Sequence, residues 1–67
     1  MADPVSWLMI EPGWEVVDAS GKVLGTVREV LGDEERDIWD GLRIGAGVYV
    51  PAERVTEIVT GRIIVRT

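Results

Sequence analysis

The sequence of 67 residues contains no cysteine and no histidine. Without cysteine a disulfide is excluded, and without either residue the usual ligands of a structural zinc ion are missing. A chain of this length buries only about 60% of the surface that it exposes when unfolded, and small domains often add a disulfide, a metal or a partner subunit. We therefore expect this chain to rely on self-association for stability.

The same two absences argue against catalysis. Histidine is the commonest general base and cysteine is the strongest side-chain nucleophile. Ser6 and Ser20 do not lie in a motif that resembles a nucleophile elbow. The sequence predicts a protein that is not an enzyme and that has no cofactor.

Basic residues are also few and scattered. The chain has 7 Lys and Arg against 12 Asp and Glu, a net charge of −5. Nucleic-acid binding rests mainly on clustered basic side chains that neutralise phosphates. The sequence therefore predicts that the protein does not bind nucleic acid.

Long apolar runs are missing as well. The run Trp7-Leu8-Met9-Ile10 is too short to cross a bilayer or to serve as the apolar part of a signal peptide, and the amino terminus carries Asp3 instead of a cluster of positive charges. We expect no insertion into a membrane and a cytoplasmic location.

What is present is the pattern of a small all-β protein. Hydrophobic residues make up 46% and charged residues 28% of the chain, which is ordinary for a folded domain. Short apolar segments alternate with glycine and proline, and they predict strands at 14–19, 22–31, 38–45, 48–50, 55–60 and 62–66. A single helical turn is expected at 51–54, with Pro51 at its first position. The spacing favours a small antiparallel β-barrel of about six short strands.

A hairpin from Gly13 to Val30 organises this arrangement. Its turn runs from Asp18 to Lys22, where Gly21 is the residue most suited to a positive φ. Strict alternation fails in the second strand, so a bulge or kink is expected there, with Gly25 as the bend. On this interpretation, valine at position 25 lowers the free energy of unfolding by more than about 1 kcal/mol through crowding and lost backbone freedom.

The amino-terminal residues 1–11 form a separate segment ahead of a barrel domain at 12–67. Within that segment, residues 5–11 are apolar and fit three alternatives, namely a first strand, a plug at the end of the barrel, or an arm that docks on another subunit. Composition does not choose among them.

The acidic stretch 32–37 is interpreted as a solvated loop. Alternate acidic residues from Asp33 to Asp40 faintly resemble a calcium-binding loop. However, Ile38 stands where such a loop needs glycine, and Ile44 stands where it needs glutamate. The sequence therefore predicts no metal site.

Aromatic and aliphatic residues that remain after one face of each strand is assigned to the core are candidates for a protein interface. They are Trp7, Trp39, Tyr49 and Ile64, with Trp14 as a further possibility. Alternation in 38–45 predicts that Trp39 points away from the apolar face of its own strand. For each of these residues, filling or covering the core is an equally good explanation. Three tryptophans in a short chain favour a homodimer, built from the amino-terminal segment and the face around Trp39 and Ile64, with arginine-acid pairs at its rim.

The order of these motifs resembles the PRC-barrel family. The resemblance covers residues 12–66 and rests on an Asp18-turn-Gly21 hairpin, the strand Val23-Leu24-Gly25-Thr26-Val27, the segment Val50-Pro51-Ala52-Glu53-Arg54-Val55 and a final strand after Gly61. It implies a compact β-barrel of the type found in the reaction-centre H subunit, in a ribosome-maturation factor and in free-standing small prokaryotic proteins. These uses differ, so the resemblance implies an architecture for interactions and not one task.

Three functions follow as expectations. The first is a non-catalytic protein-interaction or assembly module, and the second is an accessory factor in ribosome maturation that binds a basic ribosomal protein. The third, suggested by the reaction-centre subunit, is a proton relay formed by four acidic residues, Glu15, Asp18, Glu29 and Asp40. Acidic residues at alternating strand positions are more simply explained as a solvated face.

Overall fold

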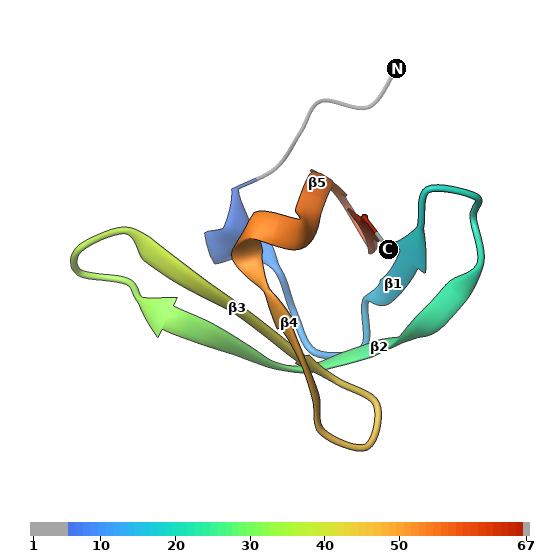
Figure 1. The fold of residues 1–67 in the computed structure, drawn as a ribbon. Helices are drawn as coiled ribbons and strands as arrows, with labels where there is room; N and C mark the ends of the chain where they lie inside the picture. Colours follow the sequence, from blue (N-terminus) through green and yellow to red (C-terminus); the bar gives the residue numbers. More distant parts are fainter. Residues whose placement is uncertain (1–5, 67) are drawn as a thin grey trace.

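Six β-strands and two 3-10 turns form the regular structure of residues 6–66, the part of the chain that the computed structural model describes (Figure 1). In chain order the elements are η1 (Trp7–Met9), β1 (Glu15–Asp18), β2 (Val23–Asp33), β3 (Ile38–Ile44), β4 (Val48–Pro51), η2 (Ala52–Arg54), β5 (Val55–Val59) and β6 (Arg62–Val65). The predicted all-β class with six short strands is confirmed. The helical turn begins one residue later than expected and ends at the expected residue, because Pro51 ends β4 and caps η2 instead of occupying its first position.

The strands form one sheet in the order β4-β3-β2-β1-β6-β5. All neighbours are antiparallel except β1 and β6, which pair in parallel from Glu15 with Arg62 to Asp18 with Val65. The expectation of a wholly antiparallel barrel is therefore corrected to a mostly antiparallel sheet. Its end strands, β4 and β5, follow each other through η2 but are not paired, so backbone hydrogen bonds do not close the described strands into a barrel.

The sheet has two halves. One contains β1, β5 and β6, the other contains β3 and β4, and strand β2 is shared by both. Its first residues pair with β1, and from Val27 onward it pairs with β3. The predicted bulge is found, because Val27 pairs with Ile44 and Glu29 with Arg43, which leaves Arg28 unpaired between them. A second irregularity lies at Leu24, next to Gly25. These irregularities bend β2 and bring the two halves of the sheet face to face (Figure 1).

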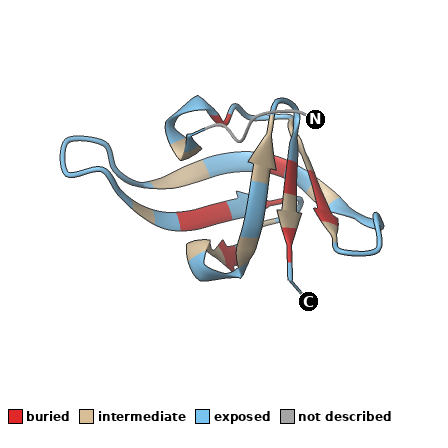
Figure 2. Cartoon of the chain, turned by 90° about the horizontal axis from the view of Figure 1, so that it is seen from above, coloured by how far each residue is buried: buried red, intermediate tan, exposed pale blue. Residues whose placement is uncertain are grey.

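The core lies between the two halves. Figure 2 shows buried positions in the middle of the strands, whereas the loop between β2 and β3 is exposed. The buried side chains of the core cluster are Ile10, Val16, Val27, Leu42, Ile44, Val50, Ile63 and Val65. None of the buried residues within 6–66 is polar or charged, so the core is held together by apolar packing.

The apolar segment before the sheet folds back on its own domain. Of the predicted residues 5–11, Val5 lies outside the described part of the chain, as do residues 1–4 of the amino-terminal segment. The described part is not a strand, because it forms the turn η1. Ile10 is 7% exposed and belongs to the core cluster, so this segment completes the core of the domain.

Among the helical elements that the structure describes, none has the length and apolar character needed to cross a bilayer.

Candidate protein-interaction surfaces

Ionisable side chains do not gather into a site. Within residues 6–66 there is no group of three or more Asp, Glu, His or Cys side chains placed to hold a metal ion. The four residues considered for a proton relay are engaged or solvated separately, since Glu15 pairs with Arg62 at 3.4 Å and Glu29 and Asp40 are exposed. The chemistry that the surface offers therefore lies in its apolar and aromatic side chains.

Asp18 closes the turn that joins β1 and β2. Its Oδ1 accepts hydrogen bonds from the Ser20 hydroxyl at 2.6 Å and from the backbone N–H groups of Ser20 and Lys22. Gly21 adopts the predicted positive φ, at 91°. The Ser20 hydroxyl and then the Lys22 N–H lower the pKa of Asp18, because they stabilise its ionised form. A proton carrier needs the opposite shift, so Asp18 acts as a turn residue.

This lowered pKa predicts a pH dependence of stability. An aspartate whose pKa is lower in the folded state stabilises the fold above the pKa of the unfolded chain, near 3.8, and loses that effect as pH falls through the folded pKa. We expect NMR titration to give Asp18 a pKa below 3.8. We also expect Asp18→Asn to be less stable than the parent at neutral pH, with a difference that disappears in acid. A difference that persists unchanged in acid would contradict this role.

The two tryptophans chosen as interface candidates contact each other. The rings of Trp7 and Trp39 are stacked with centroids 6.1 Å apart and planes 3° apart. Trp7 Nε1 donates to Asp37 Oδ1 at 3.0 Å, and Trp39 Nε1 donates to the Gly41 carbonyl at 2.8 Å. Both indole N–H groups are therefore used inside the chain, and the stack fastens the amino-terminal segment to β3.

The predicted orientation of Trp39 is wrong. Gly32 pairs with Trp39 while Leu31 pairs with Gly41, so Asp40 is an extra residue in β3. This bulge reverses the alternation of the strand, and Trp39 packs against the core cluster whereas Ile38 is 53% exposed. Sequence alternation alone does not reveal such a bulge.

Tyr49 lies on the outer face of the β2-β3-β4 half. It pairs with Arg43, which pairs in turn with Glu29. The ring of Tyr49 covers Gly41, its hydroxyl donates to the Asp40 carbonyl at 3.0 Å, and the residue remains 47% exposed. We name this surface the tyrosine face and define it by its apolar members, which are Leu31, Ile38, Tyr49 and Pro51.

Ile64 lies on a different face. It pairs with Val17 of β1 in the other half of the sheet, and Val17 pairs with Val23 of β2. Val17 is buried and Ile64 is half-buried, so Val23, at 52% exposed, is the exposed member of this apolar row. The structure therefore does not bring the four interface candidates onto one surface.

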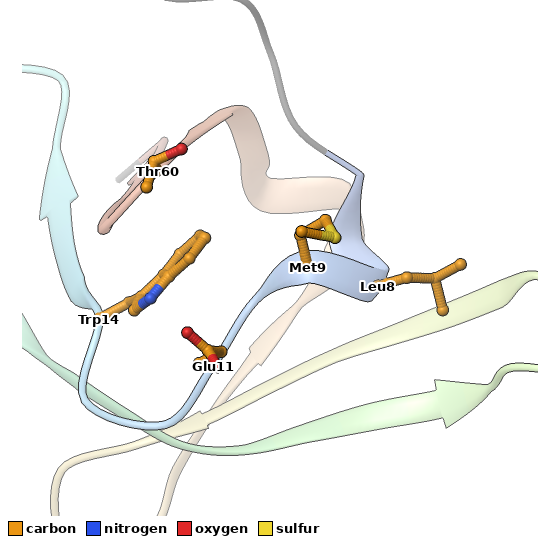
Figure 3. Close-up of a pocket in the computed structure, with 5 residues that line it drawn as sticks. All are labelled: Leu8, Met9, Glu11, Trp14 and Thr60. Atoms are coloured by element: carbon orange, nitrogen blue, oxygen red, sulfur yellow. The ribbon is translucent and has the colours of Figure 1, made fainter.

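A pocket of about 320 Å³ opens beside η1, and sequence reasoning missed it. It is lined by Leu8, Met9, Glu11, Trp14 and Thr60 (Figure 3). Leu8 and Met9 are 48% and 61% exposed, although they belong to the most apolar run of the segment. The sequence signal for this exposed apolar surface was the length of the apolar run, because a single 3-10 turn cannot direct all of its side chains to the core.

The sheet and these surfaces define a small all-β domain that exposes apolar and aromatic side chains on its sheet faces and beside η1. Residues 13–67 match the family model of the PRC-barrel domain, nearly the whole chain, so the protein belongs to this family. The resemblance in the sequence is thereby confirmed. Domains of this family are generally non-catalytic modules. A search of the curated proteins finds no match to this chain.

Proposed function

We propose that this PRC-barrel domain is a non-catalytic protein-interaction module that assembles as a homodimer through the tyrosine face. The observation that carries the proposal is an outer sheet face on which Ile38 and Tyr49 are 53% and 47% exposed. Tyrosine and large aliphatic side chains are typical anchors of protein interfaces. An exposed sheet face can make a self-complementary contact with the same face of a second copy.

Charge around the tyrosine face supports a two-fold arrangement. Arg43 and Glu29 are register partners with opposite charges on this face. In a symmetric dimer, each arginine can approach the acidic residue of the other copy, as expected for the rim of an interface. A dimer also supplies the additional stabilisation that a domain without a disulfide lacks.

Two matched variants test the proposal by sedimentation velocity. We expect the parent protein to sediment as a species of twice 7.4 kDa at high micromolar concentration. Ile38→Glu should give a folded monomer, because it places a charge in the interface. Val23→Glu is the control, since Val23 is a β-branched residue of nearly equal exposure on the other half of the sheet. It should remain dimeric.

A parent protein that remains monomeric would overturn the proposed dimer, as would dissociation by Val23→Glu but not by Ile38→Glu. Circular dichroism of each variant confirms that a change of mass does not arise from unfolding.

A further inference from the structure

The pocket beside η1 is held in shape by the backbone around it. Its Glu11 and Trp14 walls belong to one tight turn, in which Trp14 N–H donates to the Glu11 carbonyl at 3.3 Å. That turn is fastened to β2, because Gly13 N–H donates to the Val27 carbonyl and Val27 N–H donates to the Trp14 carbonyl, both at 2.8 Å. The indole and the carboxyl group are thus attached to a fixed segment of chain.

The opposite wall is fixed as well. Met9 lies in η1, where its N–H donates to the Ser6 carbonyl at 2.9 Å, and the Ser6 side chain caps the turn at Leu8. The next residue, Ile10, is buried in the core. Figure 3 shows Met9 and Trp14 facing each other across the opening, with Glu11 below and Thr60 at the far edge. The backbone of both walls is therefore held in place by hydrogen bonds.

The lining selects one class of ligand. It combines an indole ring, a thioether, an aliphatic side chain and a threonine with a single carboxylate and no basic group. An aromatic face attracts cations, and a carboxylate pairs with them. Neither of the two ion pairs found in residues 6–66 involves Glu11. The volume of about 320 Å³ lies at the small end of ligand pockets, which suits one side chain better than a cofactor.

We propose that this pocket binds an arginine side chain of a partner protein. The aliphatic stem of the arginine lies between Met9 and Trp14. Its guanidinium group stacks on the face of the Trp14 ring and pairs with the Glu11 carboxylate. Arginine fits better than lysine because its planar group stacks on aromatic rings and presents two N–H groups to one carboxylate. The net charge of −5 also favours a basic partner. This inference rests on the proposed function in one respect only, namely that the arginine belongs to a partner protein.

The test uses three short peptides with blocked ends, glycine-arginine-glycine, the same peptide with lysine, and the same peptide with uncharged citrulline. The indole N–H signals of the three tryptophans are followed by NMR during titration. We expect saturable movement of the Trp14 signal with the arginine peptide. We expect binding of the citrulline peptide to be about tenfold weaker, because it loses the charge.

Two charge-matched variants locate the binding. Glu11→Gln should weaken binding of the arginine peptide by about fivefold or more, whereas Glu57→Gln, which removes the same charge from an exposed position on β5, should change it by less than about twofold. Equal binding of arginine and citrulline peptides, equal effects of the two variants, or absence of movement at Trp14 would overturn the proposal. Equal binding of the lysine peptide would overturn the assignment to arginine.

The titration is repeated on monomeric Ile38→Glu, whose altered residue lies on the tyrosine face. Binding that persists there supports the pocket independently of the dimer. A dimer that forms while the arginine peptide does not bind would overturn the pocket alone.

Discussion

Replacing Gly41 by alanine is expected to lower the free energy of unfolding by about 3 kcal/mol or more, which is most of the stability that a core of this size supplies. A Cβ atom at this position would overlap the Val50 carbonyl oxygen and would lie 3.1 Å from Pro51 Cα and 3.1 Å from Tyr49 Cε1. The first two atoms belong to the backbone of the paired strand β4. They cannot move away without breaking the pairing between β3 and β4.

The matched control is Gly25→Ala. A Cβ atom there would meet Ile44 Cδ1 at 3.6 Å, which is an ordinary contact, and Gly25 does not have a positive φ. We expect a change of at most about 1 kcal/mol, because alanine suits a strand interior at least as well as glycine does. Urea denaturation followed by tryptophan fluorescence measures both variants. Equal stability of the two would contradict the role of close approach at Gly41.

The expected loss of stability for valine at position 25 stays a prediction. A Cβ atom there has ordinary space beside Ile44, and the crowding would arise from the two methyl groups that valine adds. The bend in β2 is present, but the bulges at Leu24 and Arg28 produce it. Close approach instead requires glycine at Gly41, where the ring of Tyr49 and the backbone of β4 approach the chain, and at Gly32, where the backbone of β3 does so.

The sequence indicates the strands well because their signals are local. Turn residues such as Asp18 and Gly21 mark the ends of strands, and all predicted strand ends lie within two residues of the observed ones. The parallel pairing of β1 with β6 is not local, since it joins Glu15 to Arg62. Local patterns do not carry that information.

The candidate surfaces were harder to predict for a related reason. The bulge at Asp40 exchanges the faces of Ile38 and Trp39, so an apparent surface tryptophan is packed and an apparent core isoleucine is exposed. The pocket depends on Trp14 and Thr60, which lie far apart in the sequence and meet only after the sheet has formed. Residue type is sufficient to identify Tyr49 as a candidate for a surface contact. The residues that surround it are decided by the register between β2, β3 and β4, which the sequence does not reveal.

Replacing Trp39 by alanine is expected to lower the free energy of unfolding by about 2–3 kcal/mol, which is less than for a fully buried tryptophan because Trp39 is half-buried. The variant removes a large side chain that packs on the core, together with the hydrogen bond to the Gly41 carbonyl and the stack with Trp7. Trp7→Ala should lower the free energy of unfolding by less, about 1–2 kcal/mol, because it removes the stack and the hydrogen bond to Asp37 but leaves the Trp39 side chain in place at the bulge.

Thermal and urea unfolding of both variants and of the double variant measure the coupling between the rings. We expect a coupling of about 0.5–1.5 kcal/mol, the range for aromatic pairs. A Trp39→Ala protein that is as stable as the parent would show that Trp39 does not stabilise the fold. A Trp7→Ala protein that loses as much stability as Trp39→Ala would show that Trp39 contributes nothing beyond its contact with Trp7. Trp39→Phe separates the contribution of the ring from that of the indole N–H.

The same stack connects stability to recognition. Trp7, Leu8 and Met9 share the turn η1, so the stack of Trp7 on Trp39 positions the Met9 wall of the pocket. In Trp7→Ala the fold should persist while this wall loses its anchor. We therefore expect the arginine peptide to bind Trp7→Ala several times more weakly than the parent, by about threefold or more, although Trp7 does not line the pocket. Unchanged affinity would show that Ile10 and the Ser6 cap are sufficient to hold η1 in place.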